Sequence, residues 1–98
     1  METISLNKLG SMEIKKKLIN IIKSIIEKNS WTQSYAAEIL GIDQPKVSQI
    51  KNDKINGFSL ERLLVFLKKL NYTVIIKVAK NEEVKPELEK VKYEIELQ

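Results

Sequence analysis

The sequence contains neither cysteine nor histidine, and it has few aromatic residues and little glycine or proline. Without cysteine there are no disulfides or thiolate ligands, and without histidine the commonest general base and transition-metal ligand are missing. The longest apolar run, Leu63–Leu67, is far shorter than the roughly 18 residues of a membrane-spanning helix. Met1–Gly10 has neither the basic start nor the long apolar segment of a secretory signal. We therefore expect a cytoplasmic protein with no membrane segment.

The remaining residues offer no recognisable active site. Asp, Glu, Lys, Ser and Tyr form no acid–base or nucleophile pair at a familiar spacing, and there is no glycine-rich phosphate loop. The acidic run with Glu82, Glu83, Glu87 and Glu89 fits a solvated connection better than a metal cluster. We therefore expect a protein that is not an enzyme and that uses neither a cofactor nor a metal.

Length and charge indicate one domain with a preference for a polyanionic partner. At 98 residues, with 43% hydrophobic and 31% charged residues, the chain suffices for a single hydrophobic core. The formal charge of +4 divides as +3 over Met1–Ser30, +2 over Trp31–Leu70 and −1 over Asn71–Gln98. Of the 17 basic residues, 16 are Lys, so Arg62 alone could make bidentate guanidinium contacts. The positive potential therefore belongs to the first 70 residues.

Two longer helices are predicted from apolar residues spaced three and four apart. The first covers Met12–Asn29, with Ser11 as its N-cap. Its apolar face consists of Ile14, Leu18, Ile21, Ile22, Ile25 and Ile26. The second runs from a Ser59 cap to about Leu70. Its apolar face consists of Leu60, Leu63, Leu64, Leu67 and Leu70.

Two short helices are predicted between the long ones. Thr32 can cap a helix that Gly41 stops, because glycine readily takes the positive φ required there. Asp43 can cap the next helix, since Pro45 falls in its first turn, where a missing N–H is harmless. This helix should end near Asn52, where a turn-rich stretch begins.

After Asn71 the apolar pattern changes from helical spacing to alternation. Tyr72–Lys80 is typical of a strand, and Val91–Leu97 alternates apolar and charged residues. A strand needs a partner for its backbone groups. The two segments could form a hairpin across the polar connection Asn81–Lys90, which contains Pro86, or the strand could pair with its copy in a second molecule.

The most specific motif is TQSYAAEILGIDQPKVSQIKNDK, from Thr32 to Lys54. The small Ala37 lets two helices approach closely, and Gly41 makes the turn between them. Val47 and Ile50 then anchor the following helix to the core. Together these constraints predict a helix-turn-helix rather than a generic helical hairpin.

On these residues the chain resembles the Xre family, the Cro and lambda-repressor type of DNA-binding domain, over roughly Ser11–Leu70. The segments WTQSYAAEILGIDQPKVSQIKND and FSLERLLVFLKKLNYTVIIKV are more similar still to small antitoxins of HigA type and their stand-alone relatives, over about Met12–Val78. The resemblance implies a mainly α, lambda-repressor-like bundle of four to five helices with a C-terminal strand or hairpin. It also implies homodimerisation, operator binding and, in antitoxins, neutralisation of a toxin encoded alongside.

The chain then divides into three parts. Residues 1–10 form an N-terminal segment and residues 11–71 a helix-turn-helix DNA-binding domain. Residues 72–98 form a C-terminal β segment that could serve in dimerisation.

The second helix of the motif is predicted to enter the major groove of double-stranded DNA. With Val47 and Ile50 turned inward, its candidate base-reading residues are Gln44, Lys46, Ser48 and Gln49. The glutamines offer paired donor and acceptor groups to adenine, the lysine can donate to guanine, and the small serine is adaptable. Each could instead be an ordinary solvated residue.

Phosphate contacts are expected at Thr32 and Gln33, where free backbone N–H groups and the helix dipole favour an anion. The other side of the site would be held by Lys51, Asn52 and Lys54. The resembled family places its contacts similarly. Asp53 departs from the glycine often found there and adds a negative charge, which predicts a modest affinity.

Two functions therefore compete. The first is a sequence-specific, dimeric repressor that binds a palindromic operator, associates with the nucleoid and neutralises a toxin if it is an antitoxin. The second is a protein-interaction module in which the helix-turn-helix is only a scaffold. Asp43, Asp53 and the modest net charge motivate the second reading.

Overall fold

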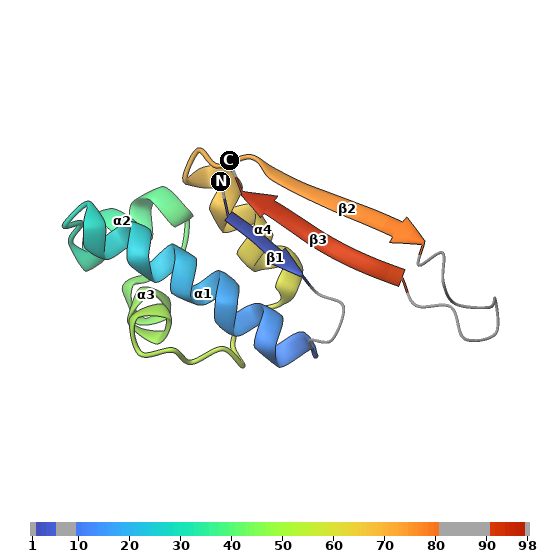
Figure 1. The fold of residues 1–98 in the computed structure, drawn as a ribbon. Helices are drawn as coiled ribbons and strands as arrows, with labels where there is room; N and C mark the ends of the chain where they lie inside the picture. The colour runs from blue at the N-terminus through green and yellow to red at the C-terminus, as the bar shows by residue number, and fades with distance from the viewer. Residues whose placement is uncertain (1, 6–9, 81–90, 98) are drawn as a thin grey trace.

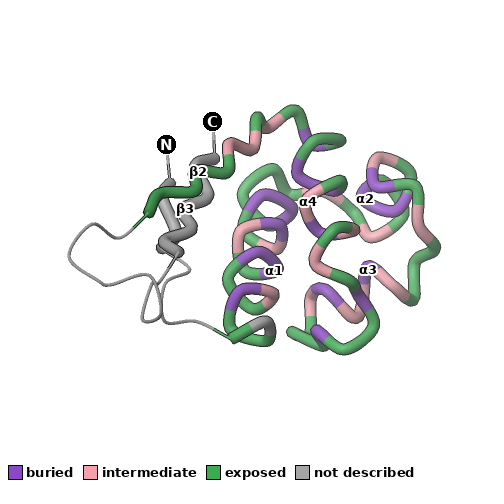
Figure 2. Tube along the Cα trace, turned by 90° about the vertical axis from the view of Figure 1, so that its right-hand side faces the viewer, coloured by how far each residue is buried: buried purple, intermediate pink, exposed green. Residues whose placement is uncertain are grey.

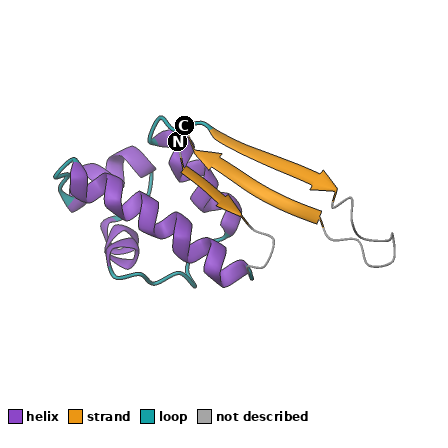
Figure 3. Ribbon diagram, in the orientation of Figure 1, coloured by secondary structure: helices purple, strands orange, loops and turns teal. Residues whose placement is uncertain are grey.

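The computed structural model describes residues 2–5, 10–80 and 91–97 of the chain. In these residues four helices are followed by a hairpin, and a short N-terminal strand joins it (Figure 1, Figure 3). The elements are β1 (Glu2–Ser5), α1 (Ser11–Lys28), α2 (Gln33–Leu40), α3 (Gln44–Lys51), α4 (Leu60–Lys69), β2 (Val74–Lys80) and β3 (Val91–Leu97). This is the mainly α, lambda-repressor-like architecture that the sequence predicts. No helix in the described part of the chain is long and apolar enough to cross a membrane.

Side-chain caps fix the start of three helices. Thr32 Oγ1 accepts a hydrogen bond from the Tyr35 amide at 3.1 Å, and Asp43 Oδ1 accepts one from the Lys46 amide at 2.9 Å. Ser59 caps α4 in the same way. These three caps confirm the prediction from sequence. The fourth prediction is wrong, because the N-cap of α1 is Gly10, whose extended backbone leads directly into a helix that already includes Ser11.

A residue with positive φ lies just after each of the four helices, beginning with Ser30, which has φ 53° after α1. Gly41 has φ 70° after α2, as the sequence predicts, and Asn71 has φ 69° after α4. Asp53 also lies in this region, with φ 57°, in the turn after α3. Asn and Asp tolerate the left-handed conformation better than other non-glycine residues, which explains why the chain can turn sharply at these points.

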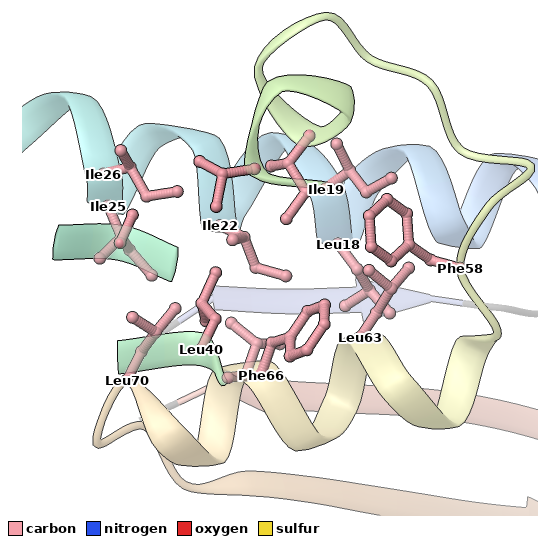
Figure 4. Packing of buried hydrophobic residues seen from close by; sticks show 14 of the residues in the cluster. Leu18, Ile19, Ile22, Ile25, Ile26, Leu40, Phe58, Leu63, Phe66 and Leu70 are labelled. Atoms are coloured by element: carbon pink, nitrogen blue, oxygen red, sulfur yellow. The ribbon is translucent and has the colours of Figure 1, made fainter. Parts of the chain in front are cut away.

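The core lies between the four helices and is built from aliphatic side chains and two phenylalanines (Figure 4). Each fully buried Leu, Ile or Phe contributes about 1.5–3 kcal/mol by leaving water. The buried residues are Ile14, Leu18, Ile19, Ile22, Ile25, Ile26, Ala36, Ala37, Leu40, Val47, Ile50, Ile55, Phe58, Leu63, Phe66, Leu67 and Leu70. Ile19 and Phe66 lie outside the faces predicted from sequence, whereas Ile21 is only half-buried.

The strands form an antiparallel sheet in the order β1-β3-β2. Val74 pairs with Leu97 and Lys80 with Val91, so the two C-terminal strands pair within one chain. The structure thus contains the hairpin, one of the two pairings that the alternating pattern left open. The strand β1 is not predicted from the sequence. The connection Asn81–Lys90 lies outside the described residues.

The sheet and the helix-turn-helix lie at opposite sides of the molecule. In Figure 2, α1 and α4 stand between the sheet on one side and α2 and α3 on the other. Val74, at the start of β2, packs against the core, and β2 contacts α4. This arrangement leaves the outer faces of α2 and α3 uncovered by the sheet.

Candidate nucleic-acid interface

Helices α2 and α3 form a helix-turn-helix with a three-residue turn, Gly41 to Asp43. On α2 the small residues Ala36 and Ala37 are buried, which allows the helices to approach closely. On α3 the side chains of Val47 and Ile50 are fully buried. Because these two lie on one face of a short helix, the opposite face of α3 is turned to solvent. The motif therefore has the geometry that the sequence predicts.

A hydrogen bond between side chain and backbone joins the first residues of the two helices. Gln33 Nε2 donates to the Gln44 carbonyl oxygen at 2.9 Å. This bond fixes the start of α3 relative to the start of α2. It also brings one predicted phosphate-contacting residue next to one predicted base-reading residue.

The four predicted base-reading residues differ in accessibility. Gln44 is exposed, whereas Lys46, Ser48 and Gln49 are partly exposed. The Gln49 amide lies beside the α3–α4 loop, since a Cβ added at Gly57 would be 2.7 Å from Gln49 Oε1. Gln49 therefore flanks the solvent face of α3, and Gln44 stands at its N-terminal end.

The C-terminal end of α3 is held by Asn52. Its Nδ2 atom donates to the Ser48 carbonyl oxygen at 2.9 Å and lies 3.3 Å from Ser48 Oγ. A phosphate contact from Asn52 Nδ2 would have to replace one of these bonds. By contrast, Thr32 accepts a hydrogen bond through Oγ1 and keeps its hydroxyl hydrogen available.

Three lysines contribute positive charge near α3. Lys54 is exposed, and Lys46 and Lys51 are partly exposed. No described acidic side chain forms an ion pair with any of them. The three lysines can therefore contact a polyanion near both ends of α3.

Asp53, which the sequence marks as an unfavourable charge, has a counter-ion in the structure. Its Oδ2 atom lies 3.3 Å from Lys23 Nζ on α1. The ion pair is partly exposed, so it contributes on the order of 0–1 kcal/mol to stability. It nevertheless offsets the negative charge in the turn after α3.

An open hollow of about 370 Å³ lies beside the C-terminal half of α3. It is lined by Met12, Gln49, Asp53, Lys54, Ile55, Asn56 and Gly57. Sequence reasoning finds Gln49 and Lys54 but misses the contributions of Met12 and Gly57. No local signal identifies these two, because one lies on α1 and the other in the loop before α4.

These features define the class of the protein: a helix-turn-helix domain whose second motif helix presents a polar face flanked by lysines. A family model described as a helix-turn-helix domain matches residues 2–79, and it describes no enzyme. A solved structure named as an XRE family transcriptional regulator has a TM-score of 0.72 and 36% sequence identity, covering 76% of this chain and 84% of that chain. The chain therefore belongs to the XRE family of helix-turn-helix proteins. A comparison with curated protein sequences finds no significant match.

Proposed function

We propose that the protein is a sequence-specific, double-stranded DNA-binding transcriptional regulator that acts as a dimeric repressor. The observation that carries this proposal is α3, anchored by Val47 and Ile50 and presenting polar and basic residues to solvent. A helix of this width fits the major groove of B-DNA. The similarity to a structure named as an XRE family transcriptional regulator supports the same function.

In this proposal Gln44, Lys46, Ser48 and Gln49 read bases. The exposed Gln44 can make a bidentate contact with adenine, and Lys46 can donate to guanine. Ser48 faces the groove beside them, and Gln49 approaches bases from the side of the α3–α4 loop. Gln44 is thus the residue whose loss should alter sequence preference most.

Phosphates are bound on both sides of α3. Thr32 and Gln33 lie at the N-terminus of α2, where backbone N–H groups and the helix dipole attract an anion. The second side consists of Lys51, Asn52 and Lys54, with Asn52 exchanging a bond to Ser48 for one to phosphate. Such contacts set the register of the domain on DNA and make its affinity salt-dependent.

Two copies of the domain would bind a palindromic operator with half-sites about 10 base pairs apart. The resemblance to HigA-type antitoxins adds a toxin as a protein partner to this proposal. A cytoplasmic, nucleoid-associated location follows from the proposed DNA binding. A toxin could be neutralised through a surface that leaves α3 free.

Selection from a random duplex pool at fixed, moderate salt tests the proposal. The wild type should enrich a palindrome, and the single variants Gln44→Ala and Gln49→Ala should change the enriched sequence at separate positions. Asn20→Ala removes an exposed amide from α1 and serves as the matched control. If neither wild type nor control enriches any sequence, the DNA-binding proposal is wrong.

The second candidate is a protein-interaction module. Asp43 and Asp53 flank α3 with negative charge, which favours a partner other than DNA. In that case a stoichiometric protein partner should protect Lys46 and Gln49, and DNA binding should be absent even at low salt.

A further inference from the structure

Gly57 lies in the loop between α3 and α4, at a position where the backbone does not require glycine. Among the described glycines, Gly41 has a positive φ and Gly57 does not, so residues with a side chain can adopt the backbone conformation of Gly57. Gly57 is also exposed to solvent. The lack of a side chain at this position therefore has a cause other than backbone conformation or burial.

The structure provides that cause in the side chain of Gln49 on α3. A Cβ atom at Gly57 would lie 2.7 Å from Gln49 Oε1 and 3.8 Å from Gln49 Cδ. Apart from the chain neighbours of Gly57, no other described residue has an atom within 4 Å of that Cβ position. Non-bonded heavy atoms pack best at about 3.5–4.0 Å. A side chain at residue 57 and the present position of the Gln49 amide therefore exclude each other.

The loop is held in place on both sides of Gly57. The Lys54 amide donates to the Gln49 carbonyl oxygen at 2.9 Å, and the Phe58 amide donates to the Ile55 carbonyl oxygen at 3.2 Å. Ile55 and Phe58 are buried, and Phe58 points into the core (Figure 4). Withdrawing either side chain would expose apolar surface to water. A clash at Gly57 would thus be relieved by movement of the Gln49 side chain and not of the loop.

The Gln49 amide has room to move and no competing contact. Gln49 and Gly57 line the same open hollow of about 370 Å³. No hydrogen bond joins the Gln49 amide to another described residue, so its donor and acceptor groups are available to a base. A glutamine side chain has many rotamers in solution. The surface against which the amide lies therefore decides which direction it takes.

We infer that Gly57 positions Gln49 for base reading and is a specificity-determining residue that acts through Gln49. The inference rests on the proposed DNA-binding function. A bidentate contact with adenine requires both polar atoms of the amide at fixed places. Because Gly57 has no side chain, the amide can lie against the loop at the edge of α3. A methyl group at residue 57 would push the amide away and remove this alignment.

Gly57→Ala should reduce sequence discrimination without reducing stability. The loss of bidentate geometry should lower discrimination between bases at one operator position at least about fivefold. The midpoint of urea unfolding should stay at or above that of the wild type, because alanine restricts the unfolded chain. Selection from a random duplex pool at fixed, moderate salt measures the first effect. A residue that serves only folding would show the reverse, with lower stability and unchanged base preference.

Gly10→Ala is the matched control. Gly10 has φ −76°, and a Cβ atom there would lie 2.7 Å from Glu13 Oε2. The control thus adds the same methyl group against the end of a flexible polar side chain, but at the start of α1. It should enrich the same sequences as the wild type. If Gly10→Ala altered base preference as much as Gly57→Ala, the effect would not depend on Gln49 and the inference would be overturned.

Combination with Gln49→Ala tests whether the effect passes through Gln49. Without the Gln49 amide, a methyl group at residue 57 has nothing to displace. Gly57→Ala should therefore alter preference at the same operator position as Gln49→Ala and add nothing to it in the double variant. Unchanged preference in Gly57→Ala, or an effect that persists in the Gln49→Ala background, would overturn the inference.

The side-chain amide signals in NMR spectra report the contact without DNA. Gly57→Ala should shift the signals of Gln49 Nε2, whereas those of Gln33, which donates to the Gln44 carbonyl oxygen, should stay in place. If the Gln49 signals do not move, the positioning contact is absent and the inference is wrong.

The selection experiment separates this inference from the proposed function. If the wild type enriches a sequence and Gly57→Ala enriches the same one equally well, the function stands and the inference alone fails. If the wild type enriches no sequence, the proposed function fails, and the specificity role of Gly57 fails with it even where the Gln49 signals move.

Discussion

Gln33 Nε2 donates to the carbonyl oxygen of Gln44 at 2.9 Å, and this bond joins the first residue of α2 to the first residue of α3. The two residues lie 11 positions apart, across the turn of the motif. A side chain at one helix start thus holds the backbone of the other, so the residues proposed to contact phosphate and bases keep fixed relative positions before DNA binds. Such preorganisation reduces the ordering required on binding.

Gln33→Ala should therefore weaken DNA binding more than it weakens folding. The bond is exposed, so its loss should change the free energy of unfolding by about 1 kcal/mol or less. Affinity should fall about tenfold on every sequence, because Gln33 contributes positioning and not base reading. Fluorescence anisotropy with specific and random duplexes, together with urea unfolding, measures both effects.

The matched control is Ser34→Ala, which removes an exposed side chain from the next residue on α2. It should leave DNA affinity and stability near wild type. If Gln33→Ala changed sequence preference without lowering affinity for random DNA, the positioning role would be wrong.

Asp53→Asn should tighten DNA binding. The substitution removes a negative charge from the turn after α3, where phosphates are proposed to bind, and it frees Lys23 from its ion pair. Asn tolerates the left-handed φ of 57° at this position, so the fold should be preserved. Stability should change by no more than about 1 kcal/mol, since the ion pair is partly exposed.

Binding isotherms at low and moderate salt test this expectation, with Glu38→Gln as a control that makes the same change in net charge on the second half of α2. Asp53→Asn should gain more affinity than the control at both salt concentrations. Equal gains would mean that only the net charge of the protein matters.

The salt dependence of binding should identify the phosphate-contacting lysines. Each phosphate contact releases counterions, so Lys51→Ala and Lys54→Ala should each reduce the slope of log affinity against log salt by about 1. Sequence preference should be unchanged, because phosphate contacts carry no base information. Lys17→Ala, on an exposed position of α1, should leave the slope unaltered. If Lys51→Ala or Lys54→Ala left the slope unchanged, the lysine replaced in that variant would not contact phosphate.

The local parts of the fold were predictable from sequence because short-range chemistry specifies them. A Thr, Asp or Ser side chain caps the helix that follows it, and Gly41 supplies a positive φ that few residues adopt. Apolar spacing then identified Val47 and Ile50 as the anchors of α3. These signals lie within a few residues of the structure that they determine.

The contacts between distant segments were not predictable in the same way. The alternation in Tyr72–Lys80 is the same for pairing within a chain and between chains, so only the structure shows the hairpin. Asp53 and Lys23 are 30 residues apart, and nothing in the sequence pairs them. Ile19 is buried because α1 contacts both α3 and α4, which requires a wider apolar face than a single stripe predicts.

Replacement of Gly41 should show how far the turn of the motif depends on glycine. Gly41 has φ 70°. For a residue with a side chain, this left-handed conformation costs about 1–2 kcal/mol of conformational energy. A Cβ there would also lie 2.9 Å from Lys69 Nζ, which donates to the Leu40 carbonyl oxygen at 3.1 Å and so helps to end α2. Gly41→Ala should therefore lower the free energy of unfolding by at least about 1 kcal/mol in urea titrations.

Lys69→Met separates the two causes, because it removes the hydrogen bond to Leu40 and leaves the glycine in place. It should be milder than Gly41→Ala and lower the free energy of unfolding by about 1 kcal/mol, as is typical for loss of one partly buried hydrogen bond. If the added methyl group displaces the Lys69 ammonium, combining the two substitutions should add little beyond Gly41→Ala, because both remove the same hydrogen bond. If backbone strain alone acts, the two effects should add. If Gly41→Ala had wild-type stability, the turn would be able to relax away from its left-handed conformation. The DNA affinity of this variant would then show whether α2 and α3 keep their relative orientation.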